Sequence, residues 1–344
     1  MRVVEVTEPG GPEVLRIVDR PTPVPGAGEV LLEVFAASVN RPDVQQRRGL
    51  YPPPPGVTDI LGLDAAGRVA AIGPGVEGFA VGGTVCALTN GGAYADYVVV
   101  PAAQCMPVPR GFDFIQAASL PEAFFTAWNN IIWLGCLAKG ETLLVQGGTS
   151  GVGLAGMQIA RHLREARVFA TAGSDDKLAI CLKAGADAAF NYREDWAGQI
   201  RALAGDHCID LALDGQAGPY VQAQLDLLAP DGRLVLIASH QSPFAEVNVR
   251  HLVRRRLTLT GSTLRPRSSA YKGRIAAALV DNVWPLLETG RIETHIHAAL
   301  PFEAVRDAHA ILDANAQIGK VVLVMNEAEA RRIPNPLPDP VRTA

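Results

Sequence analysis

Cysteine is scarce in this chain of 344 residues. The cysteines are odd in number, and no two of them stand in the CxxC spacing that zinc knuckles use. They are scattered over the sequence as Cys86, Cys105, Cys136, Cys181 and Cys208. This usage argues against a disulfide framework and against a cysteine-rich zinc site. We therefore expect reduced thiols and a cytoplasmic location.

A surplus of charge of one sign is also missing. The chain has 31 Lys and Arg against 35 Asp and Glu, which predicts neither a nucleic-acid partner nor a membrane-surface partner. The short basic run 254–256 is expected to be a solvated helix end. The most apolar stretch, residues 117–137, contains Pro121, Glu122 and two asparagines, so it indicates a buried helix and no membrane span. The first residues also lack the apolar segment of a secretory signal peptide.

Two common catalytic motifs are absent. Gly148 and Gly153 have the spacing of a phosphate-binding P-loop, but Leu154 stands where that loop needs a lysine. The chain also has no GxSxG sequence, which excludes the nucleophile turn of the serine hydrolases. Phosphoryl transfer by a P-loop enzyme and serine-dependent hydrolysis are therefore not expected.

The apolar content is high enough for a large core, because 48% of the residues are hydrophobic and 19% are charged. The length suggests two domains. Residues 1 to about 120 contain short β-like runs between Gly- and Pro-rich turns, which predicts an irregular β domain. After residue 265 we expect a long helix over about 270–288, then strand, helix and strand up to residue 324. These last elements are expected to return to the first domain. The charged, Pro-rich tail from Asn326 is expected to be frayed or to form an arm.

The segment from about 122 to 265 alternates between strand-like and helix-like patterns. This alternation predicts an α/β unit with a doubly wound parallel sheet of six strands. The predicted strands are Thr142–Gln146, Arg167–Thr171, Ala188–Phe190, Ile209–Asp214, Arg233–Ala238 and Leu257–Thr260. The predicted helices between them include Gly151–Leu163, Asp175–Lys183 and Trp196–Leu203.

A glycine-rich turn at 147–153 is the strongest local signal. An apolar strand leads into it, and an amphipathic helix begins at once, with Ser150, Gly151 and Val152 at the junction. Glycines let the backbone turn tightly and approach a pyrophosphate, while the free N–H groups at the helix start face the negative charge. Strand, turn and helix together predict a dinucleotide-binding site.

The tip of the second predicted strand indicates which dinucleotide is used. Proteins that bind NAD usually place an acidic residue there to bind the ribose hydroxyls, but this chain has Gly173. Gly173 is expected to leave space for a phosphate, with Ser174, Lys177 and Tyr192 as donors, which favours NADPH. The alternative is that Ser174 or Asp175 caps the helix while Lys177 is solvated. The carboxylates of 175–176 count against a phosphate unless they point away.

Several segments together resemble the quinone oxidoreductase branch of the medium-chain dehydrogenases and reductases. The closest similarity is to the p53-inducible quinone oxidoreductase group, and it extends in order over roughly residues 1–325. The segments that carry the resemblance are Glu29–Leu31, Ser38–Asp43, Pro52–Gly56, Ile60–Gly67, Pro121–Trp128, Thr171–Ser174, Phe190–Tyr192 and Ile318–Lys320.

This resemblance implies a fold and a cofactor. A discontinuous GroES-like catalytic domain would take residues 1–121 and 270–326, a Rossmann domain 122–269, and a C-terminal tail 327–344, in a homodimer. NADPH would be the cofactor, with its nicotinamide end near Asn40 and Thr126. The implied cofactor-binding residues are Asn40, Thr126, Ser150, Gly151, Val152, Gly173, Ser174, Lys177, Tyr192, Leu264 and Lys320.

The zinc ligands of the related alcohol dehydrogenases are missing. Those enzymes hold a catalytic zinc with Cys, then a His-Glu pair and a third ligand, because the ion polarises the alcohol oxygen. Asn40 occupies the Cys position, Leu63 and Asp64 the His-Glu positions, and Ala123 lies near the third. The four-cysteine structural lobe is absent as well. We therefore expect no metal.

The resemblance implies hydride transfer from the nicotinamide to a quinone or an α,β-unsaturated carbonyl, which needs no Lewis acid. Asn40 is the candidate for orienting the nicotinamide or a carbonyl, and Tyr51 for donating a proton to the acceptor oxygen. Asp43 is a weaker catalytic candidate. Asp64 is a weaker candidate as well. The alternatives are a helix-capping Asn40, a packing Tyr51 and structural roles for Asp43 and Asp64.

Two other functions stay open at this point. The first is an NADPH-dependent enoyl or enone reductase, which would share the fold and the cofactor and differ only in the acceptor. The second is an NADPH-binding protein with little turnover. His295 and His297 would face the same side of a strand, but without a third ligand they are expected to be structural.

Overall fold

The computed structural model describes residues 1–334, and the chain folds into two compact units. Unit 1 comprises Met1–Phe125, Arg265–Gly290 and, from Thr294, the rest of the described chain; unit 2 comprises Thr126–Leu264 and Arg291–Glu293. The boundaries predicted from the sequence were 121/122 and 269/270. Residues 335–344, the end of the predicted tail, lie outside the described residues.

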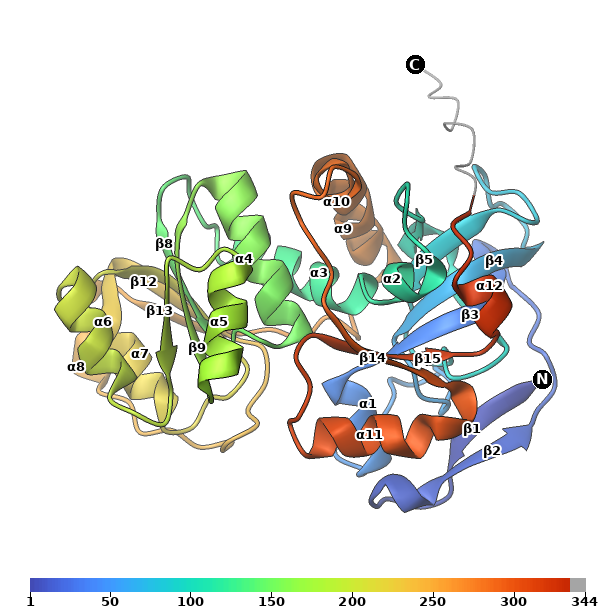
Figure 1. Cartoon of the computed structure of the whole chain (residues 1–344), viewed down its shortest axis with the longest axis horizontal. Helices are drawn as coiled ribbons and strands as arrows, with labels where there is room; N and C mark the ends of the chain where they lie inside the picture. The colour runs from blue at the N-terminus through green and yellow to red at the C-terminus, as the bar shows by residue number, and fades with distance from the viewer. Residues whose placement is uncertain (335–344) are drawn as a thin grey trace. The chain divides into compact units, whose positions relative to one another are not determined.

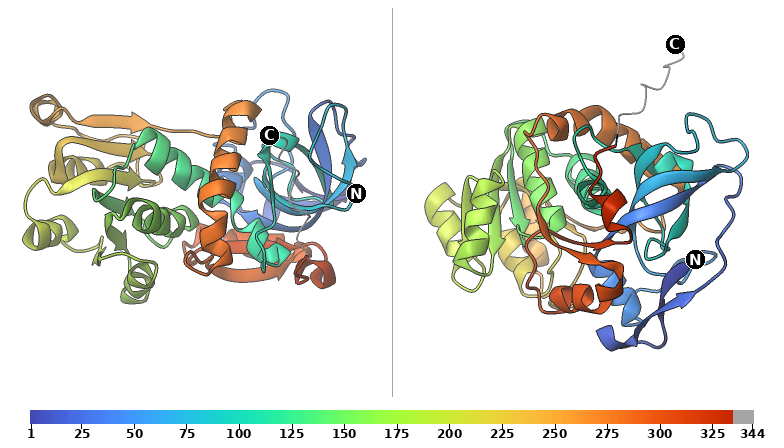
Figure 2. Two further views of the ribbon diagram at one scale, coloured as in Figure 1. Left: turned by 90° about the horizontal axis from the view of Figure 1, so that it is seen from above. Right: turned by 45° about the vertical axis from the view of Figure 1, so that its right-hand side comes forward.

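A mixed seven-stranded sheet forms the centre of unit 1, in the order β14-β15-β3-β4-β5-β7, with β6 also pairing with β3. The first two strands, β1 and β2, form a separate antiparallel pair at the N-terminus. The strands of the unit are β1 (Arg2–Val6), β2 (Leu15–Asp19), β3 (Glu29–Val39), β4 (Asp64–Ile72), β5 (Thr84–Leu88), β6 (Tyr97–Pro101), β7 (Cys105–Pro107), β14 (Ile296–Pro301) and β15 (Lys320–Val324). Strand β15 lies beside β3, red against blue in Figures 1 and 2.

The strand register brings three polar residues to one region of this sheet. Val321 of β15 pairs with Val39 of β3, so the preceding Lys320 falls opposite Asn40. Ala36 of β3 pairs with Ala66 of β4, and the same antiparallel register continued places Asp64 opposite Ser38. Asn40, Asp64 and Lys320 therefore lie close together, although they come from segments that are far apart in the sequence.

Helices pack on this sheet at several points. Phe114 meets Phe35 of β3 edge to face, with ring centroids 5.0 Å apart. The buried guanidinium of Arg47 donates to Nδ1 of the buried His309, and burial lowers the pKa of this imidazole to about 3, so it is neutral. The helices of the unit are α1 (Arg41–Arg47), α2 (Phe114–Ala118), α9 (Ser269–Asn282), α10 (Trp284–Glu288), α11 (Val305–Asp313), α12 (Glu327–Ala330) and the 3-10 turns η1 (Pro12–Val14), η2 (Ala102–Gln104) and η4 (Phe302–Ala304).

Two expectations about the C-terminal part need correction. The helix expected over 270–288 is two helices, because Pro285 has no N–H group and its ring would clash with the preceding turn. The start of the tail is also folded: Asn326 caps α12, Ala330 is fully buried, and Glu329 pairs with Arg68 of β4 at 2.9 Å.

Unit 2 contains a parallel six-stranded sheet in the order β10-β9-β8-β11-β12-β13, which confirms the doubly wound α/β fold. Its strands are β8 (Thr142–Gln146), β9 (Arg167–Ala172), β10 (Ala188–Asn191), β11 (Ile209–Asp214), β12 (Leu228–Leu236) and β13 (Thr258–Gly261). Its helices are α4 (Gly151–Arg164), α5 (Asp175–Lys183), α6 (Trp196–Ala204), α7 (Tyr220–Leu227) and α8 (Val249–Arg255). The strand order reverses between β8 and β11, the point where ligands bind in such sheets.

The apolar stretch 117–137 is helical and buried, but it is not one helix. It contains the end of α2, then α3 (Pro121–Ala127), then the π-helical segment η3 (Trp128–Leu134). The boundary between the two units falls within α3. Across residues 1–334, no helix is both long enough and apolar enough to span a membrane.

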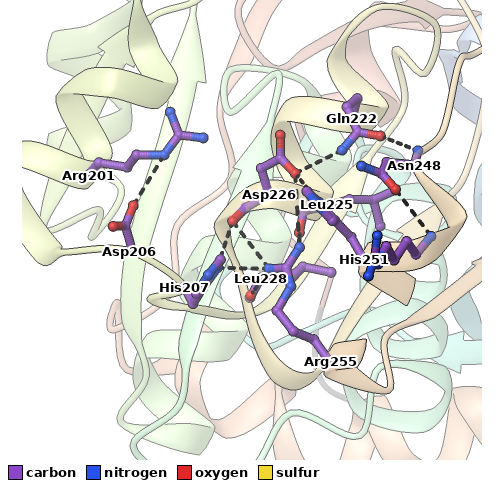
Figure 3. A network of polar contacts seen from close by, with 11 residues as sticks. Arg201, Asp206, His207, Gln222, Leu225, Asp226, Leu228, Asn248, His251 and Arg255 are labelled. Atoms are coloured by element: carbon purple, nitrogen blue, oxygen red, sulfur yellow. Dashed lines mark hydrogen bonds and ion pairs between the residues drawn. The ribbon is translucent and has the colours of Figure 1, made fainter. Parts of the chain in front are cut away.

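The basic run 254–256 is not simply a solvated helix end. Arg255 reaches back to the C-terminal end of α7 and donates to the carbonyl oxygens of Leu225 and Leu228 at 2.9 and 2.7 Å. Figure 3 shows Asp226 in the same network, accepting hydrogen bonds from Gln222 and His251. Arg255 therefore joins α7 and α8, because it satisfies carbonyl groups that a helix end leaves unpaired.

Candidate functional site

The carboxylate of Asp64 is the centre of a buried polar cluster in unit 1. Asp64 is the first residue of β4 and is fully buried. It accepts hydrogen bonds from Asn40 Nδ2 at 2.9 Å, from Lys320 Nζ at 3.0 Å and from the Glu122 backbone N–H at 2.5 Å. The hydroxyl of Ser38 also donates to it. The donors come from β3, α3, β15 and the start of α1.

Both ends of the Asn40 side-chain amide are engaged in this cluster. Its Oδ1 accepts from Lys320 Nζ, and its Nδ2 donates to Asp64 and to the Ser38 carbonyl at 3.3 Å. Asn40 also occupies the N-cap position of α1, as the capping alternative requires. The structure therefore brings Asn40 and Lys320 together, while their contacts with a cofactor stay predictions.

Asp43 lies in the first turn of α1 and is buried. Its carboxylate accepts from the backbone N–H groups of Asn40 and Gly62 at 2.8 and 3.0 Å and from the Tyr94 hydroxyl at 3.3 Å. Burial raises the pKa of Asp43 to about 6, although the two backbone donors favour its ionised form. These contacts agree with the structural alternative for Asp43, because they hold the start of α1 against the Gly62 backbone and the Tyr94 hydroxyl.

The residues at the zinc positions do not fit a zinc ion. Leu63 is buried and has no donor atom, and the Asn40 amide is occupied. Asp64 is the only carboxylate at these positions, and it already holds the ammonium group of Lys320. A second cation would have to displace Lys320 and would find one anionic ligand, where catalytic zinc sites use three protein ligands. Elsewhere in residues 1–334, no group of three or more His, Cys, Asp or Glu could hold a metal.

Tyr51 lies beside a cationic pair that sequence reasoning missed. The guanidinium of Arg265 is 5.5 Å from the centre of the Tyr51 ring, and its Nε donates to the Asn90 carbonyl at 2.8 Å. Lys272 Nζ donates to Asn90 Oδ1 and to the Arg265 carbonyl. A signal existed for Lys272, since it shares the buried face of α9 with Ile275, Ala276 and Leu279 at helical spacing.

The predicted glycine turn connects β8 to α4 in unit 2. Gly147 adopts a φ of +86°, which a side chain rarely allows, and Ser150 caps the helix by accepting from the Gly153 N–H at 2.9 Å. A Cβ on Gly153 would lie 2.7 Å from the carbonyl oxygens of both Gly147 and Gly148. Glycine is thus required for the helix to come this close to the turn. The N–H groups of Gly151 and Val152 precede the first intrahelical hydrogen bond and face the turn, as an anion site needs.

Gln146, the last residue of β8, is a second feature that the sequence did not indicate. Its side chain is buried, and neither its Oε1 nor its Nε2 has a hydrogen-bond partner within residues 1–334. An unpaired buried amide is costly, so a ligand at this strand end would find a donor and an acceptor ready. The position lies at the reversal point between β8 and β11, which supports a dinucleotide site there.

At the tip of β9, the structure differs from the expectation for Gly173 and from the capping alternative for Ser174. A Cβ on Gly173 would lie 2.3 Å from the Tyr192 hydroxyl, so the ring of Tyr192 fills the space that was expected to remain for a phosphate. Gly173 instead lets Tyr192 of the neighbouring strand end pack against the tip. Ser174 precedes α5, but within the described chain its hydroxyl makes no capping bond. The simple capping alternative therefore does not hold for Ser174.

Two basic side chains lie near this tip. Burial lowers the pKa of Lys177, and the positive charge of Arg193 lowers it further. Arg193 directly follows Tyr192 and was missed by sequence reasoning, although its place after the third strand could have indicated it. Asp175 and Asp176 are exposed. Lys177 and Arg193 thus bring two positive charges close together, and a phosphate dianion bound between them would relieve their repulsion.

The two remaining predicted contacts lie at the ends of the main segment of unit 2. The carbonyl of Thr126 accepts from Asn130 Nδ2 at 2.8 Å, and Leu264 is buried. Neither observation tests a contact with a cofactor. His295 and His297 flank the start of β14, and His297 Nδ1 accepts from the Ile318 N–H at 3.4 Å.

A dinucleotide-type α/β unit and a β-rich unit with a buried polar cluster define a two-domain protein with one Rossmann-type domain. The model of the family described as Zinc-binding dehydrogenase matches residues 151–280, and that of the Alcohol dehydrogenase GroES-like domain matches residues 26–110. The quinone oxidoreductase of Lama guanicoe is 33% identical over 94% of this chain and 98% of its own length. The chain belongs to the medium-chain dehydrogenase/reductase family, with the quinone oxidoreductases as relatives, and has its GroES-like and Rossmann folds.

Solved structures give the same family. The quinone oxidoreductase of Escherichia coli complexed with NADPH has a TM-score of 0.85 and 27% identity, covering 94% of this chain and 100% of that one. A protein described as an NAD-dependent alcohol dehydrogenase has a TM-score of 0.82 and 33% identity, covering 95% and 100%. These neighbours use different nicotinamide dinucleotides by their descriptions, so the choice of cofactor depends on the residues of this chain.

Replacing Asp64 with Asn should destabilise unit 1 strongly, because the ammonium of Lys320 would stay buried without its counter-charge. The expected loss in the free energy of unfolding is about 3 kcal/mol or more, measured by urea denaturation. The matched control is the double variant Asp64→Asn with Lys320→Met, which removes the orphaned charge and should recover part of the loss. Equal urea midpoints for the single variant and the wild type would show that the pair contributes no stability.

Proposed function

We propose that this protein transfers hydride from NADPH to quinones or related electron-poor carbonyl compounds without a zinc ion. The observation that carries this proposal is the Asp64 cluster: Lys320 supplies the only cation bonded to Asp64 within residues 1–334, and the residues at the family's zinc positions do not fit a metal. Alcohol oxidation in the zinc enzymes depends on a Lewis acid. Quinones accept hydride without one, because conjugation already delocalises the charge.

NADPH is favoured over NADH by the tip of β9. The position of the usual ribose-binding acid is Gly173, with the Tyr192 hydroxyl packed against it. The hydroxyl of Ser174 and the charges of Lys177 and Arg193 would bind a 2′-phosphate through charge-assisted hydrogen bonds. The turn at Gly151 and Val152 would hold the pyrophosphate at the start of α4.

When bound, the cofactor supplies a hydride from its nicotinamide C4. Reduction of a quinone to a hydroquinone takes two electrons and two protons in all. The hydride brings both electrons and one of the protons, so one further proton has to come from the protein or from solvent. In this proposal the Tyr51 hydroxyl donates a proton to the acceptor oxygen and regains it from solvent. The main work of the remaining residues is to hold cofactor and acceptor in line.

The first measurement is the oxidation of NADPH and of NADH, followed by absorbance, against a panel of quinones and enones. We expect turnover with quinones and a clear preference for NADPH. Turnover confined to enones would favour the enone reductase. Tight NADPH binding by fluorescence with no turnover on any acceptor would favour the binding protein.

The variant Lys177→Gln tests the phosphate site within the same assay. It should lower kcat/KM for NADPH by about 10- to 100-fold, the size of one charge-assisted hydrogen bond, and leave NADH unchanged. Lys183→Gln, an exposed lysine of the same helix, is the matched control and should behave as the wild type. An equal effect on both cofactors would remove Lys177 from phosphate recognition.

The variant Tyr51→Phe keeps the ring beside Arg265 and removes only the hydroxyl. If Tyr51 donates the proton, kcat for quinones should fall by about 100-fold, with little change in the KM for NADPH. Unchanged turnover across all acceptors would assign Tyr51 to packing.

We also propose a homodimer formed through β13. This strand is an edge of its sheet among the described residues, so its outer N–H and C=O groups have no strand partner. Exposed apolar side chains lie on the same stretch of chain, namely Phe244, Val249, Val253 and Leu259. Sedimentation velocity should give twice the mass of one chain, and Leu259→Lys should shift it toward the monomer; a monomeric wild type would refute the dimer. The cytoplasmic location stays a prediction from the scattered thiols.

A further inference from the structure

The guanidinium of Arg265 is a buried cation whose outer edge is unpaired. The residue is 7% exposed, and its Nε donates to the Asn90 carbonyl at 2.8 Å. Both Nη1 and Nη2 are buried without a hydrogen-bond partner anywhere in residues 1–334. Leaving charged donors unpaired away from water is costly, more so than for neutral groups. Such an arrangement therefore calls for a ligand that satisfies them.

The neighbouring carboxylates do not fill this role. Asp43 is close enough for its charge to act on Arg265, but its oxygens accept from Asn40, Gly62 and Tyr94. Glu122 also acts on Arg265 only through its charge, since neither Nη atom has a bonded partner in the described part of the chain. The second cation of the pair, Lys272, is bonded to Asn90 and to the Arg265 carbonyl. Two positive charges therefore share one small region.

The edge of the guanidinium that carries Nη1 and Nη2 has no hydrogen-bond partner within residues 1–334. The guanidinium carbon lies over the Tyr51 ring, 5.5 Å from its centre. The Nη2 atom lies near Gly91, and a Cβ added to this glycine would be only 3.2 Å from it. Gly91 has a φ of +144° and no side chain that could cover this edge. Two N–H groups side by side on a planar fork match the two oxygens of a carboxylate.

We propose that Arg265, supported by Lys272, is the subsite for a carboxylate substituent on the hydride acceptor. The substrate class is then a quinone or enone that carries a carboxylate on a side chain. This inference rests on the proposed function, since it names the substrate of the same site through Tyr51. A phosphate of the cofactor is the other source of an anion, and the experiment separates the two.

The test uses a matched pair of acceptors, a 1,4-naphthoquinone with a propanoate side chain and its methyl ester. The charge lies off the ring, so the two quinones accept hydride with nearly equal driving force. The wild type should show a higher kcat/KM for the acid than for the ester. Arg265→Gln should lower this acid-to-ester ratio by about 10- to 100-fold through the KM of the acid, with the ester little changed.

Two further variants keep the test decisive. Arg265→Lys retains the charge and loses the fork, so it should recover part of the ratio and will serve if the Gln variant does not fold. Arg267→Gln is the matched control, because Arg267 is exposed on the same loop and stacks on Tyr271. It should keep the wild-type ratio.

Three outcomes would overturn the carboxylate subsite. The ratio could be the same in Arg265→Gln and the wild type. Both acceptors could lose turnover equally, which would assign Arg265 to structure or to the reacting oxygen. The KM for NADPH could rise with both acceptors, which would assign the anion to the cofactor.

Failure of the proposed function is a separate result. If neither quinone is reduced, calorimetry of the same propanoate and ester with the NADPH-loaded protein replaces turnover. Tighter binding of the acid that Arg265→Gln abolishes would retain the anion subsite in a protein that is not a quinone reductase. Equal binding of acid and ester would refute the subsite as well.

Discussion

The ion pair between Asp64 and Lys320 is the interaction on which unit 1 depends. It joins the start of β4 to the start of β15, residues separated by 256 positions in the sequence, and both side chains are almost fully buried. A buried charge is stable only with a close partner and further hydrogen bonds, which Ser38, Asn40 and Glu122 supply. In the proposed function, the same cluster that orders the sheet also takes the place of a metal centre.

Unit 2 depends on a different constraint, the close approach of backbone to backbone. Gly153 has no room for a Cβ beside the carbonyls of the preceding turn, and Gly173 has none beside Tyr192. The helix start of α4 and the tip of β9 thus owe their positions to residues that have no Cβ atom. A buried ion pair thus orders unit 1, and glycines at points of close backbone approach order unit 2.

The sequence predicted the regular elements of unit 2 well, because strand and helix periods are local. The bounds of β8, β11 and α5 agree with the predicted segments to the residue. The Asp64 cluster was not predicted as a unit, since it depends on the register of β15 against β3. The filled space at Gly173 was missed for a similar reason: Tyr192 comes from the next strand. Arg265 was missed because a lone buried cation in a loop belongs to no local motif. Lys272 had a signal in its helical spacing, but only the folded chain brings the two cations to Asn90.

The discontinuity of unit 1 has a consequence for biosynthesis. A chain emerges from the ribosome from its N-terminus, and domains generally fold as units. Asp64 is made 256 residues before Lys320, which carries its counter-charge. The main segment of unit 2, Thr126–Leu264, is complete well before that. Unit 1, although it contains the N-terminus, must therefore complete its fold after unit 2.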